Sequence, residues 1–320
     1  LISSDAIFDA TKEFLNWRIF GFFFAFVNVM FRALYIGITR TKVLTLNAIV
    51  MAMVNVVLDY ALIFGHFGLP ALGLKGAAIA SVIAEASSLV FFLLYTWARI
   101  DFRKYGLNHW PRIDFTLLGR ILSISCFTMV QYFLAMATWF VFFVAVERLG
   151  QRQLAIANIV RSIYVVMLIP VQSLSTTTNS LVSNLIGAGE GKLIFSVSNK
   201  VLKLGYGVGL PLVVLAMLFA RPIIGFYTDS AMLVEVTYIP FFVMLVNYVF
   251  GLPGYVYISM VTGTGNTRLA FIFQVVTIIV YLGYLYVLSC CFTMPLAVYL
   301  TAEYVFVILL GVQSYVYLKR

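Results

Sequence analysis

The few carboxyl and amide side chains inside long apolar stretches are the residues of this sequence best suited to chemistry. Asp59 lies in the apolar segment 43–64, and Asn55 precedes it by one helical turn. Residues at i and i+4 share a helix face, so these two side chains converge. Together their oxygens can hold Na⁺, a metal site at Asp59 and Asn55, and the carboxylate alone can take a proton. Either event neutralises a charge that is costly in an apolar medium.

Four further polar residues lie at similar depth in other apolar segments. Glu85 follows Lys75 by ten residues, or about 15 Å of helix, and Glu303 has a similar depth in the last segment. Arg161 is also inside an apolar segment, and we expect a buried charge to find a partner, so the sequence predicts an Arg161–Glu303 ion pair. Gln131 is a neutral candidate. For these residues a coupling role, a place along a cleft and a structural pair all stay open.

These residues require apolar helices to position them, and the composition provides such helices. Hydrophobic residues make up 63% of the 320 residues and charged residues 10%, against roughly 45–50% and about 25% in soluble domains, which excludes a water-soluble globule. Segments of about 20 apolar residues predict membrane-spanning helices, because lipid leaves the backbone no other partner. The sequence predicts an all-α, polytopic membrane helix bundle with spans at 14–36, 43–64, 74–98, 115–146, 153–187, 196–220, 239–262, 268–291 and 295–317.

The charge distribution and the small number of reactive residues exclude some classes of function. The net charge is +9, and most basic residues fall in loops that alternate onto one membrane face. This pattern predicts a cytoplasmic C-terminus in the inner membrane and no nucleic-acid partner. The chain has 3 cysteines and 2 histidines and none of the nucleotide-binding or catalytic motifs, so we expect no enzyme and no cofactor beyond a coupling ion.

A short motif that recurs in two turns indicates an internal repeat. Gly37-Ile38-Thr39-Arg40 and Gly265-Asn266-Thr267-Arg268 share the pattern G-x-T-R, and each lies between two spans. The offset of 265 − 37 = 228 residues keeps the flanking spans in register. Three spans precede the repeated trio in the second half and none in the first, so we expect nine of twelve helices here, from two parallel lobes of six.

Several segments together resemble the multidrug and toxic compound extrusion (MATE) family of transporters. They are FRALYIGITRT at 31–41, NVVLDY at 55–60, GLPALGLKGAAIAS at 68–81, LVSNLIGAG at 181–189 and GNTR at 265–268. The resemblance covers the whole chain. It implies a twelve-helix exporter that lacks its first three helices here, with residues 1–106 as helices four to six of the N-lobe and residues 107–320 as helices seven to twelve of the C-lobe.

The resemblance also implies a function and a site. It implies a secondary antiporter that exports organic, often cationic, drugs or metabolites in exchange for Na⁺ or H⁺ by alternating access. The matching site is Asn55 and Asp59 with a hydroxyl of the next helix, for which Ser81 is the nearest match, serine where threonine is more usual. The implied partners are a small organic substrate and membrane lipids, and we expect a monomer.

Two alternatives stay open. Asp59 lies five residues before Phe64, so water at the membrane surface could solvate it without any role in transport. The nearest alternative function is a flippase for lipid-linked oligosaccharide precursors, from the related membrane superfamily. A flippase should need a strongly basic cavity for pyrophosphate, and Arg161 alone provides little of that charge.

Overall fold

The structure is a computed structural model, and it describes residues 5–101, 104–105, 114–291 and 294–319. Among these residues, nine helices are long and apolar enough to cross a membrane, which confirms the predicted all-α membrane bundle. Each of the nine leaves large apolar side chains exposed, as helices in contact with lipid do. The chain is therefore an integral multi-pass membrane protein.

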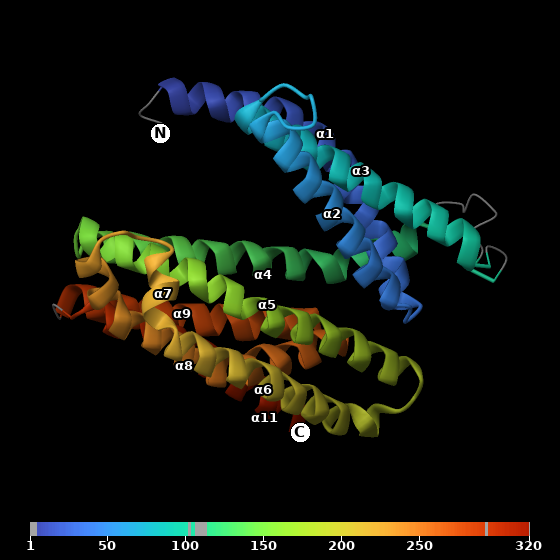
Figure 1. The fold of residues 1–320 in the computed structure, drawn as a ribbon. Coiled ribbons are helices and arrows are strands. Elements are labelled where there is room, and N and C mark those ends of the chain that lie inside the picture. The colour runs from blue at the N-terminus through green and yellow to red at the C-terminus, as the bar shows by residue number, and fades with distance from the viewer. Residues whose placement is uncertain (1–4, 102–103, 106–113, 292–293, 320) are drawn as a thin grey trace. The chain divides into compact units, whose positions relative to one another are not determined.

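The contacts divide the chain into two compact units, Leu1–Arg112 and Ile113–Arg320. The predicted boundary between residues 106 and 107 falls outside the described residues. The described residues of unit 1 form three helices, α1 (Asp5–Gly37), α2 (Lys42–Phe64) and α3 (Gly73–Arg99). Helix α3 packs against both α1 and α2 (Figure 1). At one end of the unit the Tyr35 hydroxyl lies 2.8 Å from Thr96 Oγ1, and both side chains are buried.

Unit 2 is a larger bundle built around one helix. Its elements are α4 (Phe115–Glu147), α5 (Gln151–Gly187), η1 (Gly191–Leu193), α6 (Ile194–Leu218), α7 (Ala220–Gly225), α8 (Ala231–Gly263), α9 (Thr267–Cys291), α10 (Leu296–Leu300) and α11 (Ala302–Lys319). Helix α8 packs against α5, α6, α9 and α11 (Figure 1). Its contact with α5 is the most extensive between any two helices of the described residues.

Three span boundaries differ most from the prediction. Helix α1 begins at Asp5, nine residues before the predicted start at 14. Helix α8 begins at Ala231, eight residues before the predicted start at 239, because the Ser230 hydroxyl accepts a hydrogen bond from the Leu233 N–H and caps the helix. The last span is divided into α10 and α11 at Thr301. There the Thr301 Oγ1 bonds the carbonyl of Val298, which ends the first short helix.

The two turns that carry the predicted repeat share a backbone geometry, but their left-handed residues do not correspond at the predicted offset. The left-handed residue is Thr39 (φ 60°) in the first turn and Gly265 (φ 84°) in the second. The Thr39 N–H bonds the Ile36 carbonyl, and the Gly265 N–H bonds the Thr262 carbonyl. The two turns therefore correspond at an offset of 265 − 39 = 226 residues. The predicted offset of 228 was wrong because a three-letter match cannot fix a register.

The backbones of α8 and α11 approach closely at two glycines, and this contact allows a first prediction about stability. A Cβ added at Gly254 would lie 2.5 Å from the Val307 carbonyl oxygen, and one at Gly311 would lie 3.1 Å from the Gly254 Cα. Small residues allow such backbone proximity in membrane helices. We expect Gly254→Ala to destabilise the protein by about 1–3 kcal/mol, measured as a lower melting temperature in detergent. Gly283→Ala, where a Cβ meets nothing within 4 Å, should not.

Candidate functional site

Helix α2 places Asp59 and Asn55 on one face in unit 1. Both side chains are partly buried, and the Oδ1 of Asp59 is buried with no hydrogen-bond partner among the described residues. The structure records no hydrogen bond among Asp59, Asn55 and Ser81. A buried carboxylate oxygen without a partner is unusual in proteins, because desolvating it costs free energy that nothing offsets. Asp59 therefore has an oxygen available for a ligand.

The packing of α2 on α3 determines which residue of α2 lies beside Ser81 of α3. A Cβ at Gly76 would lie 2.5 Å from the Leu62 carbonyl oxygen, so the two helices are nearly in backbone contact there. Further along, the Asn47 amide donates to the Ser88 hydroxyl at 2.8 Å. Because the helices are antiparallel, these two contacts place Ser81 level with Asn55, about one turn away from the level of Asp59.

Glu85 has a partner that sequence reasoning missed. Arg18 on α1 donates to its Oε1 at 2.6 Å, and the Asn28 amide donates to the Glu85 backbone carbonyl at 2.9 Å. The Glu85 side chain is 9% exposed and that of Arg18 is 31% exposed, so this ion pair between α1 and α3 has a buried carboxylate and a partly buried guanidinium. The available signal was Arg18, one of the two arginines of the first apolar span with Arg32, which needed a carboxylate at comparable depth in a neighbouring helix.

The predicted Arg161–Glu303 ion pair is not formed. Arg161 lies on an exposed face of α5, with its guanidinium 5.2 Å from the Trp139 ring centre and 5.1 Å from that of Phe143. Glu303 on α11 instead accepts a hydrogen bond from the Tyr281 hydroxyl at 3.0 Å. The prediction failed because a helix turns by about 100° per residue, so shared depth in two spans does not make their side chains face each other.

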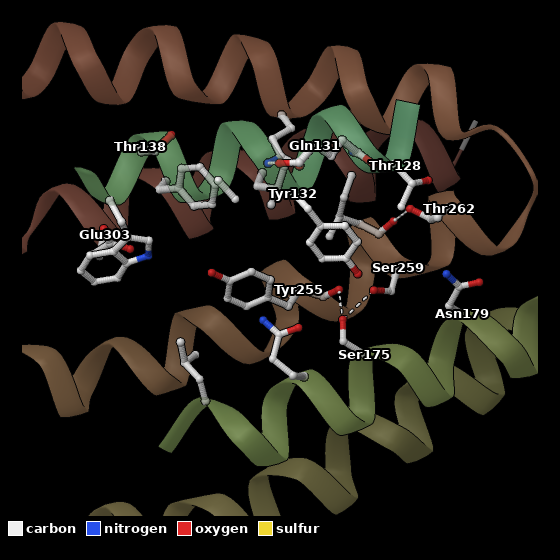
Figure 2. A pocket seen from close by; sticks show the side chains of 18 residues that line it. Thr128, Gln131, Tyr132, Thr138, Ser175, Asn179, Tyr255, Ser259, Thr262 and Glu303 are labelled. Atoms are coloured by element: carbon white, nitrogen blue, oxygen red, sulfur yellow. Dashed lines mark hydrogen bonds between the residues drawn. The ribbon is translucent and has the colours of Figure 1, made fainter. Parts of the chain in front are cut away.

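A pocket of about 270 Å³ lies inside unit 2, and Glu303 lines it. Figure 2 shows Glu303 at one end, the Tyr255 ring in the middle, and Thr128, Thr262 and Asn179 toward the other end. The complete lining is Thr128, Gln131, Tyr132, Ala135, Thr138, Trp139, Leu168, Gln172, Ser175, Asn179, Tyr255, Ile258, Ser259, Thr262, Gln274, Glu303, Phe306 and Leu310. These residues come from α4, α5, α8, α9 and α11.

Helical periodicity explains how polar residues from apolar helices gather at this pocket. On α5, Gln172, Ser175 and Asn179 are spaced by three and four residues, which is one helix face. The Ser175 hydroxyl is 2.6 Å from that of Ser259 on α8. Sequence reasoning named Gln131 and Glu303 but missed the α5 face, although its spacing was visible.

Gln131 is held in place by a neighbouring helix. It is 8% exposed, and its backbone carbonyl accepts a hydrogen bond from the Gln274 amide on α9 at 2.9 Å. This bond connects α4 to α9 on one side of the pocket. Polar groups at this depth are costly unless they bond each other or a ligand. The pocket can therefore receive a polar molecule within an otherwise apolar bundle.

Comparison with known proteins identifies the family of this chain. The MatE family model matches residues 127–287, which is just over half of the chain and includes α5, α6 and α8 entirely. The chain belongs to the MatE family. This confirms the resemblance that the sequence motifs indicated, and most of the pocket lining lies within the matched region.

Curated relatives of this MatE chain carry multidrug resistance names. It is 28% identical over 207 residues to the probable multidrug resistance protein NorM of Agrobacterium fabrum, covering 62% of this chain and 43% of that protein. It is 23% identical over 262 residues to the probable multidrug resistance protein NorM of Thermotoga maritima, covering 81% and 55%. The chain thus spans about half the length of the curated relatives it matches.

Solved MATE structures share the fold of the MatE chain. The crystal structure of the Vibrio cholerae MATE transporter VcmN in the bent form matches with a TM-score of 0.80 at 15% identity, over 99% of this chain and 70% of that one. An outward-facing multidrug resistance MATE transporter matches with a TM-score of 0.74 at 18% identity, over 86% and 61%. At these identities the likeness shows the fold.

Proposed function

We propose that the protein is a secondary antiporter that exports small organic compounds, often cationic, in exchange for Na⁺ or H⁺ by alternating access. Membership of the MatE family and the multidrug resistance names of its relatives support export. The observation that carries the coupling role is the buried, unpartnered Oδ1 of Asp59 in a membrane-spanning helix.

The coupling step follows from the chemistry of that oxygen. A charged carboxylate held away from water is unstable until a proton or a Na⁺ neutralises it. Asn55 shares the helix face and offers an amide oxygen, and Ser81 offers a hydroxyl at the level of Asn55. Ion binding would remove the local charge and change which helix arrangement is stable, and release of the ion would restore it.

The other candidate residues divide into three roles. Glu85 is already neutralised by Arg18, so we assign it to holding α1 against α3. Gln131 and Glu303 line the unit 2 pocket, so we assign them to the substrate cleft. Arg161, stacked on two aromatic rings and exposed, is assigned to the edge of unit 2, outside the pocket.

The charge of the pocket favours an exporter over a flippase for lipid-linked oligosaccharide precursors. A pyrophosphate group requires several arginine or lysine side chains. The described lining of the pocket contains one carboxylate and neither lysine nor arginine. A pocket with a carboxyl group and no basic side chain suits a cation better than a pyrophosphate.

We further propose that the protein acts as a monomer in the cytoplasmic, or inner, membrane with its C-terminus on the cytoplasmic side. The orientation is supported by the distribution of basic residues, since turns or ends that alternation places on one face carry Arg40, Lys42, Lys192, Arg268 and Lys319. A reporter enzyme that is active only in the cytoplasm, fused after Arg320, should be active. An inactive reporter would reverse the orientation.

Transport is tested directly in proteoliposomes of the full-length protein loaded with ethidium. An imposed gradient of Na⁺ or of H⁺ should drive ethidium across the membrane, and an ionophore that collapses that gradient should stop the movement. Ethidium movement that ignores both gradients would overturn the proposal of a secondary antiporter.

A further inference from the structure

We propose that a groove between α4 and α9 binds an anionic phospholipid, with the lipid phosphate at Arg148 and one acyl chain along the two helices. The groove has a volume of about 460 Å³. It is separate from the pocket that Glu303 lines, because the described linings of the two share no residue. The inference rests on the membrane-spanning fold, so it does not depend on the proposed antiport.

The groove has one end at the membrane surface. Four reversals of direction separate α4 from α9, since α5, α6 and α8 span the membrane between them. The two helices are therefore parallel, and both end at the same membrane face. The lining residues nearest that face are Arg148 beyond α4, and Ser289 and Cys290 on α9. Val141 precedes Arg148 by seven residues, which places it about 10 Å deeper in the membrane.

The deep part of the groove is apolar and open. Val141 and Val144 are each 40% exposed, and a Cβ added at Gly283 would meet nothing within 4 Å. Leu282 and Leu285 continue the apolar wall on α9. Because both helices cross the membrane, hydrocarbon surrounds this part of the groove. An acyl chain is the occupant that such a wall suits.

The surface end of the groove is polar and positively charged. Arg148 follows the last residue of α4 and is exposed, and no described residue forms an ion pair with it. The Ser289 hydroxyl oxygen is buried without a hydrogen-bond partner among the described residues. Arginine binds phosphate oxygens through paired N–H donors, and a hydroxyl can donate beside it. The described lining contains no carboxylate, so the charge of the groove complements a phosphate.

The order of these groups along the groove matches a phospholipid. In a bilayer the phosphate lies at the surface and the acyl chains run inward, and the groove places Arg148 at the surface and its valines below. A basic residue at the membrane surface attracts anionic lipids. The headgroup of a zwitterionic lipid carries its own cation, which competes with Arg148 for the phosphate. The groove therefore selects a lipid with a net negative charge.

The first test compares two lipids that differ in the headgroup alone. Phosphatidylglycerol or phosphatidylcholine with the same acyl chains is added to delipidated full-length protein in a neutral detergent, and native mass spectrometry counts the bound molecules. One phosphatidylglycerol should bind about fivefold more tightly than phosphatidylcholine. Inorganic phosphate at the same concentration should not displace it. Equal binding of the two lipids, displacement by inorganic phosphate, or a second protein chain in place of bound lipid would overturn the inference.

The second test assigns the headgroup preference to Arg148. Arg148→Gln should bind the two lipids equally, and phosphatidylglycerol should raise the melting temperature of the wild-type protein but not of this variant. Arg152→Gln is the matched control, since Arg152 is exposed at the same membrane face and does not line the groove. It should keep the fivefold preference. A preference that survives in folded Arg148→Gln would contradict the assignment.

The third test places the acyl chain in the groove. Gly283→Leu fills the open space beside α9 and should weaken phosphatidylglycerol binding about fivefold or more, with an unchanged melting temperature in the absence of lipid. Gly119→Leu is the matched control, because Gly119 is an exposed glycine of α4 with equal space around it and lies outside the groove. If folded Gly283→Leu bound phosphatidylglycerol as tightly as Gly119→Leu, the lipid would not occupy this groove.

Discussion

Asp59→Asn should reduce gradient-driven ethidium transport by about tenfold or more, to near the leak of protein-free vesicles. The substitution keeps the size and polarity of the side chain, but the amide can neither take a proton nor offer a negative charge to Na⁺. The measurement is the initial rate of ethidium movement in proteoliposomes of the full-length protein under an imposed ion gradient.

The matched control for this variant is Asp229→Asn. Asp229 is exposed between α7 and α8, so the same chemical change there removes a solvated charge. We expect normal transport and a normal melting temperature. If Asp59→Asn were folded and transported at the rate of Asp229→Asn, the solvated interpretation of Asp59 would be correct and its coupling role would be excluded.

Arg18→Gln should have the largest effect on stability. It leaves the Glu85 carboxylate in unit 1 buried without its partner, 2.6 Å away in the native protein. Removing one member of a buried ion pair typically costs about 3–5 kcal/mol. Thermal unfolding in detergent, followed by circular dichroism, should show a clear fall in melting temperature. The double variant Arg18→Gln with Glu85→Gln should recover much of that loss, since no buried charge remains.

The control is an ion pair between the same two helices whose carboxylate is exposed instead of buried. Lys75 Nζ on α3 lies 3.9 Å from Glu13 Oε1 on α1, and the two side chains are 33% and 56% exposed. Exposed pairs contribute about 0–1 kcal/mol, so Lys75→Gln should barely change the melting temperature. Equal effects of Arg18→Gln and Lys75→Gln would show that burial does not strengthen the Arg18–Glu85 pair.

The helices were predictable because they depend on local composition. Runs of apolar residues long enough to cross a bilayer defined all nine spans, and the spacing of Asn55 and Asp59 put both on one face of α2 without any tertiary information. The early start of α8 was missed because its first turns include Glu235 and Thr237, which lower the local hydropathy that marked the span.

The partners of the polar residues were not predictable, because they depend on which helix faces meet. Glu303 contacts Tyr281 on α9, and Arg161 points to Trp139 on α4. A tyrosine in an apolar span does not reveal from the sequence that its hydroxyl donates a hydrogen bond to a carboxylate. The pocket required five helices to converge, so only fragments of it, such as Gln131, could be recognised in the sequence.

The most direct measurement of the coupling claim follows the ion and the exported compound in the same vesicles. Proteoliposomes of the full-length protein carry ethidium and an internal reporter of Na⁺ or of pH. We predict that the ion enters in a fixed ratio to the ethidium that leaves, whatever the size of the gradient, and that Asp59→Asn stops both movements. Ethidium export without ion entry, or ion entry that persists in Asp59→Asn, would contradict the mechanism.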